Sequence, residues 1–152
     1  MTRGEAITSQ ADINKIADIA SKTDYTLWIP TRSWRKDSTG KTFLRGLNAL
    51  RKVKNLRVLA SVDTSNTKEE LDTLKKANMS IMFFGDNDRA SAKKEFLPAG
   101  YKYVLCPKLW SKGKAKDKKM HCGNCSVGCF NADTNVPVFV HLKEHSVINK
   151  AK

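Results

Sequence analysis

The sequence has no hydrophobic run long enough to cross a membrane, and its first residues contain no apolar stretch like that of a signal peptide. Its first 105 residues also contain no cysteine, so disulfide bonds cannot hold most of the chain together. These absences argue against a membrane protein and against a disulfide-rich secreted domain. We therefore expect a protein of the reducing cytoplasm that has no membrane partner.

Common catalytic signatures are missing as well. No Ser, His and Asp occur in an order that favours acyl transfer. The stretch 38–42, Ser-Thr-Gly-Lys-Thr, resembles the end of a phosphate-binding P-loop, but Arg35 stands where that motif needs its leading glycine. The sequence therefore indicates no catalytic residue and leans away from an enzyme.

All four cysteines lie near the end of the chain, with the spacing C-x15-C-x2-C-x3-C. Four thiolates that close a tetrahedron are the usual ligands of a structural zinc ion. Two disulfides or four unrelated thiols are the alternatives, but scattered cysteines would rarely fall in one short window. The spacing predicts one Zn²⁺ site, with a [4Fe–4S] cluster as the alternative metal centre, formed by Cys106, Cys122, Cys125 and Cys129.

Positive charge is concentrated in two stretches of the chain, whose net charge is +13. Residues 32–57 hold nine Lys or Arg and one Asp, and residues 108–119 hold six Lys and one Asp, so their net charges are +8 and +5. Such concentration favours a polyanionic partner, either nucleic acid or a nucleoprotein, with an acidic protein or simple solvation as alternatives. The candidate contacts are Arg32, Trp34, Arg35, Lys36, Lys112, Lys114, Lys116, Lys118 and Lys119, with Trp34 or Trp110 stacking on an exposed base.

Helical and strand patterns alternate along the chain. Apolar residues at helical spacing predict helices at 9–21, 41–52, 91–97 and after Thr67. Continuous apolar runs predict strands at 25–30, 56–62, 80–84, 101–105 and 136–142. This alternation indicates an α/β fold with a mostly parallel sheet and flanking helices. We expect one domain, 1–152, with the sheet in 1–105 and the cysteine loop and last strand in 106–152.

Polar residues follow several predicted strands. Because the carboxyl ends of parallel strands meet at one edge of the sheet, these residues should share a rim. For each aspartate, turn formation or helix capping is the alternative role, and Trp34 could be a partly buried loop anchor. The predicted rim contains Arg32, Trp34, Asp63, Asp86, Asp88 and Cys106.

Five short motifs resemble those of a known protein family. They are 26–33 (TLWIPTRS), 59–63 (LASVD), Cys106-Pro107, the run from Cys122 to Phe130, and 138–141 (VFVH). Together they are similar to successive motifs of the phage protein family typified by mycobacteriophage gene product 88. The resemblance implies a phage origin and a partial α/β barrel, because longer relatives resemble part of a radical-SAM-type barrel.

The chain resembles only the C-terminal half of those longer relatives. It has no upstream C-x3-C-x2-C motif, so the resemblance implies no SAM-binding cluster, no radical chemistry and no established activity. Our sequence-based hypothesis is a metal-stabilised, basic phage-type protein that binds nucleic acid or a host nucleoprotein, with a role against host defence as one version. The alternatives are an iron–sulfur enzyme (or a remnant or subunit of one) and an inhibitor of an acidic protein.

Overall fold

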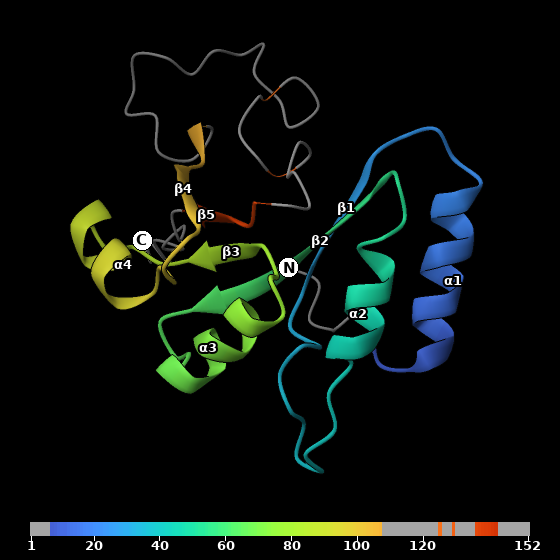
Figure 1. Cartoon of the computed structure of the whole chain (residues 1–152), viewed down its shortest axis with the longest axis horizontal. Helices are drawn as coiled ribbons and strands as arrows, with labels where there is room; N and C mark the ends of the chain where they lie inside the picture. The colour runs from blue at the N-terminus through green and yellow to red at the C-terminus, as the bar shows by residue number, and fades with distance from the viewer. Residues whose placement is uncertain (1–6, 108–124, 126–128, 130–135, 143–152) are drawn as a thin grey trace, which may run out of the picture.

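The computed structural model describes residues 7–107, Cys125, Cys129 and residues 136–142. Its strands form one five-stranded, all-parallel sheet in the order β1-β2-β3-β5-β4 (Figure 1). The strands are β1 (Leu27–Thr31), β2 (Leu56–Asp63), β3 (Ile81–Phe84), β4 (Lys102–Leu105) and β5 (Val138–Leu142). The helices are α1 (Gln10–Ser21), α2 (Leu44–Leu50), α3 (Lys68–Lys76) and α4 (Arg89–Glu95). The predicted α/β class, with a parallel sheet and flanking helices, is confirmed.

Two helices begin at capping boxes. Ser9 Oγ accepts from the Asp12 amide at the start of α1, and the Asp12 carboxylate accepts from the Ser9 amide in return. Thr67 and Glu70 make the same reciprocal pair at the start of α3. Each box satisfies amide groups that the first helical turn leaves without a partner, so these helix starts follow from local sequence.

The other two helices differ from their predicted limits. Helix α4 begins two residues early, because Asp88 Oδ1 accepts from the Ala90 and Ser91 amides and so caps it. Helix α2 begins later than predicted, because the Lys41 amide donates to Asp37 Oδ1 at 3.0 Å and is held in a turn. No helix among the described residues is both long and apolar enough to span a membrane.

The two faces of the sheet bury different apolar clusters. All four helices pack on one face, where Val58, Val62, Ile81 and Phe83 meet Leu47, Leu50, Leu71 and Leu74. We call the opposite side of the sheet the second face; it buries Leu59, Met82, Val138, Val140 and Leu142. Neighbouring residues of a strand alternate between these clusters, as the period of two requires. Burial on both faces explains why the strands read as continuous apolar runs.

The order of the strands departs from a barrel. A β/α barrel adds its parallel strands in chain order, whereas here β5 enters between β3 and β4. All five residues of β5 are buried, while β4 begins at exposed Lys102 and is otherwise half-buried. The more apolar strand thus takes the inner position and β4 forms the edge. The order of the described strands therefore differs from the chain order that a partial barrel would have.

Candidate functional site

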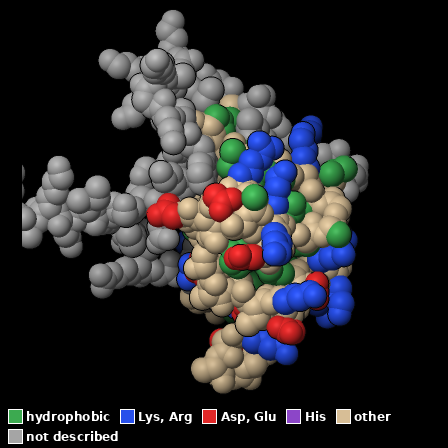
Figure 2. Space-filling model, turned by 90° about the vertical axis from the view of Figure 1, so that its left-hand side faces the viewer, with side chains coloured by type: hydrophobic (Ala, Val, Ile, Leu, Met, Phe, Trp, Pro, Cys, Tyr) green, Lys and Arg blue, Asp and Glu red, His purple; other side chains and the backbone are tan. Residues whose placement is uncertain are grey.

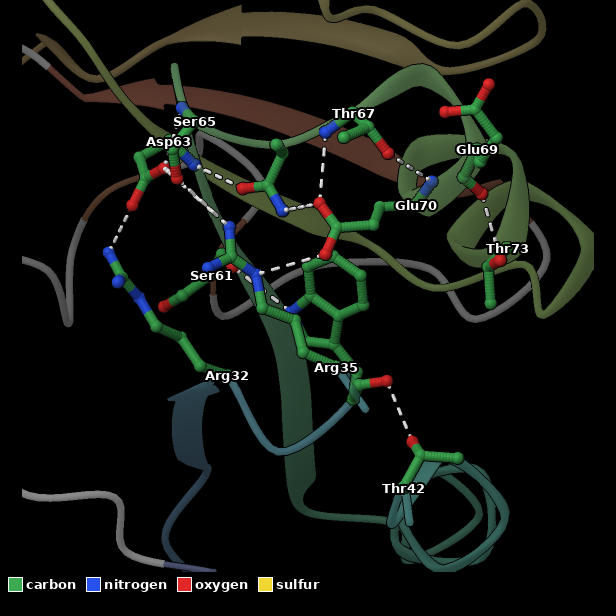
Figure 3. Close-up of polar contacts among 12 residues, drawn as sticks. Arg32, Arg35, Thr42, Ser61, Asp63, Ser65, Thr67, Glu69, Glu70 and Thr73 are labelled. Carbon is green, nitrogen blue, oxygen red and sulfur yellow. Dashed lines mark hydrogen bonds and ion pairs between the residues drawn. The ribbon is translucent and has the colours of Figure 1, made fainter. Parts of the chain in front are cut away.

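Two arginines and two carboxylates meet at the carboxyl edge of β1 and β2 (Figure 3). Arg32 Nη2 lies 2.5 Å from Asp63 Oδ2, and Arg35 Nη2 lies 3.7 Å from Asp63 Oδ1. Arg35 Nε lies 3.8 Å from Glu70 Oε1. We call these four residues the carboxyl-edge network. Two positive and two negative side chains make the network neutral as a unit.

The fold positions Asp63 between the two arginines. Strand β1 ends at Thr31, which pairs with Ala60 in β2, so Arg32 leaves the sheet beside the last residues of β2. The Asp63 carboxylate also accepts from the Ser65 amide at 2.9 Å and from Ser65 Oγ at 2.5 Å. Burial alone would raise the pKa of Asp63, but the Ser65 hydrogen bonds and the two arginines hold it below its ordinary value. Asp63 is therefore ionised at neutral pH.

Glu70 is fixed by the same local structure that starts α3. Its Oε2 atom accepts from Asn66 Nδ2 at 2.8 Å and from the Thr67 amide at 3.0 Å. Asn66 is buried, and its Oδ1 atom accepts from the Asp63 amide at 2.9 Å. The side chains that neutralise the two arginines are thus held in place by hydrogen bonds of their own.

Arg32 and Arg35, the predicted phosphate contacts, both face carboxylates of the same chain. A phosphate that binds either guanidinium group would therefore compete with Asp63 or Glu70. The predicted rim does bring Arg32 and Asp63 together, as an internal ion pair. Lys36 is exposed and makes none of the ion pairs among the described residues.

The prediction that Trp34 stacks on a base is wrong. Its side chain is 3% exposed, and its indole Nε1 donates to the Ser61 carbonyl at 3.1 Å. The Thr42 hydroxyl donates to the Trp34 carbonyl at 2.8 Å and ties the loop to the start of α2. Trp34 is therefore the loop anchor that the sequence offered as its alternative role. Trp110 lies outside the described residues.

Asp86 and Asp88 lie beyond β3 and do not join the network. Asp88 is the N-cap of α4, and its hydrogen bonds from Ser91 and then from the Ala90 amide hold its pKa below the ordinary value. Asp86 is exposed. Figure 2 views the molecule from the side toward which β2 and β3 point in Figure 1, and shows Lys and Arg side chains interspersed with Asp and Glu. The described part of this side is not a uniformly basic surface.

A buried histidine at the end of β5 was missed as a polar site by sequence reasoning. His141 is 0% exposed; its Nδ1 lies 2.6 Å from Tyr103 Oη and its Nε2 lies 3.0 Å from the Gly85 carbonyl oxygen. A carbonyl only accepts, so Nε2 carries the proton and Nδ1 accepts from the Tyr103 hydroxyl. Burial lowers the pKa of His141, which favours this neutral form. The sequence feature that could have pointed to this site is a single polar residue, His141, inside the apolar run 138–142.

Gly85, whose carbonyl oxygen meets His141, is packed too closely by its neighbours to carry a side chain without a shift of one of them. A Cβ atom at Gly85 would lie 2.7 Å from Phe83 Cζ and 2.9 Å from Asn87 Oδ1. Two cations of α4 lie over the Tyr103 ring, Arg89 at 5.7 Å and Lys93 at 5.0 Å from the ring centroid. Both nitrogens of the imidazole have hydrogen-bond partners, so the arrangement stabilises the strand ends.

Three of the four cysteines are described, each half-buried, and no disulfide joins them. Cys106 follows β4 and packs against the apolar cluster of the second face, as does Cys129. Within the described residues, no three His, Cys, Asp or Glu side chains are grouped as a metal site requires. Cys122 and Lys112, Lys114, Lys116, Lys118 and Lys119 lie outside the described residues.

These features define a parallel α/β protein with a neutral polar network at its carboxyl edge and half-buried thiols on its second face. The chain belongs to the Gene product 88 family of phage proteins, whose family model matches residues 6–128. The matched range contains β1 to β4 and Cys106, Cys122 and Cys125, and it ends before Cys129 and β5. No curated protein and no solved structure matches the chain. The resemblance seen in the short motifs is thereby confirmed at the level of the family.

Proposed function

We propose that the protein is a metal-stabilised phage protein that binds nucleic acid, either directly or within a host nucleoprotein, through exposed lysines. One observation supports the binding role. Because the carboxyl-edge network is neutral, the net positive charge of the chain comes from residues outside it. Residues 38–62 contain six Lys or Arg and no Asp or Glu. Phosphates compensate such an excess, and counterions released from the nucleic acid drive the association.

The metal part of the proposal places one ion at Cys106, Cys122, Cys125 and Cys129. Its support is that Cys106 and Cys129 pack against the same cluster although they are far apart in sequence. Thiolates are the donors that zinc prefers in structural sites, and four of them leave no open position for a substrate. Bound zinc would supply cross-linking of the last third of the chain rather than catalysis.

Metal analysis of protein purified without oxygen tests this part. We expect colourless protein that contains one zinc ion per chain and loses it to a chelator. Brown protein that contains iron and sulfide would contradict the zinc assignment and would favour the iron–sulfur alternative.

Fluorescence anisotropy of labelled oligonucleotides tests the binding part. We expect the intact protein to bind single-stranded DNA or RNA at low salt, and excess polyglutamate to compete weakly. Binding to polyglutamate with no affinity for any oligonucleotide would contradict the nucleic-acid role and would favour an acidic protein as the partner.

A further inference from the structure

We infer that the nucleic-acid contact lies at the amino edge of the sheet, opposite the rim that the sequence predicts, and that it fits a single strand. This inference rests on the nucleic-acid binding proposed above and assigns its surface. The surface consists of four exposed lysines around half-buried Arg51, together with exposed Tyr25. We call the lysines the amino-edge cluster: Lys52, Lys54, Lys75 and Lys76.

Parallel connectivity brings these lysines to one edge. Helices α2 and α3 return along the sheet, so each ends where the next strand begins. Lys52 and Lys54 lie in the connection between α2 and β2, and Lys75 and Lys76 form the last turn of α3, before β3. Figure 1 shows both helices running back across the sheet toward these strand starts.

Hydrogen bonds join the two connections. Arg51 Nη1 donates to the Ala77 carbonyl at 2.9 Å and to Asn48 Oδ1 at 3.2 Å, which ties the end of α2 to the end of α3. The Tyr101 hydroxyl donates to the Met79 carbonyl at 2.6 Å, just beyond α3. The backbone that carries the four lysines is thus held in place, and their spacing on the surface is set by the fold.

The four lysines differ from Arg32 and Arg35 in a decisive way. None of them forms an ion pair with a carboxylate in the part of the chain that the structure describes. Lys75 and Lys76 lie at the negative end of the α3 dipole. Lysines are favourable at that position even when no ligand binds. That explanation does not extend to Lys54, which lies four residues beyond the end of α2.

An exposed aromatic ring lies beside the cluster. Tyr25 is 80% exposed, and Asn55 Nδ2 donates to the Tyr25 carbonyl at 3.3 Å and to the Ala20 carbonyl at 2.7 Å. Asn55 directly precedes β2, so it fixes Tyr25 next to the connection that carries Lys52 and Lys54. Cations beside an exposed ring suit a single strand, whose phosphates meet the lysines while an unstacked base lies on the ring.

Matched charge variants test this surface. The first replaces Lys52, Lys54, Lys75 and Lys76 with Gln, and the control replaces four exposed lysines elsewhere, Lys15, Lys68, Lys93 and Lys94, with Gln. Both lose the same charge. We expect the first variant to bind labelled oligothymidylate or oligouridylate about tenfold or more weaker, with a log–log salt slope shallower by about 2 to 3. The control should keep most of the parent's slope. Thermal melts of both variants check that neither has unfolded.

Tyr25 variants test the stacking contact separately. Tyr25→Ala should weaken binding by about fivefold or more with an unchanged salt slope, and Tyr25→Phe should restore it. Equal losses in the two lysine variants, or a Tyr25→Ala protein that binds like the parent, would overturn this assignment while the parent's binding stands. A parent protein with no affinity for either oligonucleotide would overturn the proposed function and this inference together.

Discussion

Arg32 and Asp63 form the shortest ion pair among the described residues, with 2.5 Å between Nη2 and Oδ2. The arginine directly follows β1 and the aspartate ends β2, so the pair links two neighbouring strands at their carboxyl ends. Asp63 also contacts Arg35 through its other oxygen atom. This one carboxylate therefore makes the edge polar without leaving it strongly positive.

Asp63→Asn should destabilise the protein by about 1 kcal/mol near neutral pH, because a neutral amide attracts the two arginines less. The folded-state pKa of Asp63 is lowered, so its stabilisation is present at neutral pH and is lost as the pH falls through that pKa. Urea unfolding at several pH values measures the difference, with exposed Asp72→Asn as the control. A difference that stays constant into acid would show that charge is not its cause.

The carboxyl-edge network also shows what sequence reasoning could reach. The alternation of helices and strands, the two capping boxes and the meeting of strand ends all follow from local pattern. The neutralisation of Arg32 and Arg35 does not, because it depends on which strand lies beside β1 and on the position of Glu70 in α3. Charge counts along the chain therefore indicated unpaired cations at Arg32 and Arg35, whereas the fold pairs both with carboxylates.

The position of β5 in the sheet and the environment of His141 could not be predicted from local sequence either. Both depend on which strands lie side by side. Phe139 pairs with Ile81 in β3 and with Tyr103 in β4, and both partners are far from it in sequence. The run 138–142 predicts a strand, but its neighbours depend on which pairing buries all five residues. Only that pairing brings Tyr103 to His141.

His141 should make folding sensitive to mild acid. Burial lowers its folded-state pKa from the ordinary 6.5, so below about pH 6.5 the unfolded chain binds this proton more readily. Stability should therefore fall as pH decreases through this window, by at most about 1.4 kcal/mol per pH unit. Chemical denaturation between pH 7.5 and 5 measures this slope in the parent and in His141→Gln. The variant should be less stable at pH 7.5 and show a smaller slope. An identical slope would assign the acid sensitivity to other groups, since both proteins keep the other two histidines.

Cys125→Ser should expose the last third of the chain to proteases if the four cysteines bind a metal. Residues 108–135 contain few apolar groups, so without metal they cannot offset the entropy cost of ordering. We expect limited trypsin digestion to cleave this segment faster and to spare the sheet within residues 25–105. Ser126→Ala, in the same run, is the matched control. A Cys125→Ser protein that digests like the parent would show that metal does not hold the segment.

The salt dependence of nucleic-acid affinity tests the central claim most directly. Anisotropy titrations of the intact protein with single-stranded DNA and RNA at increasing salt give the slope of log affinity against log salt concentration. Four lysine–phosphate contacts predict a slope of about −3 or steeper, at about −0.7 per contact. A slope in that range would support a phosphate-binding protein. No affinity for either strand at low salt, or an affinity that does not change with salt, would contradict it.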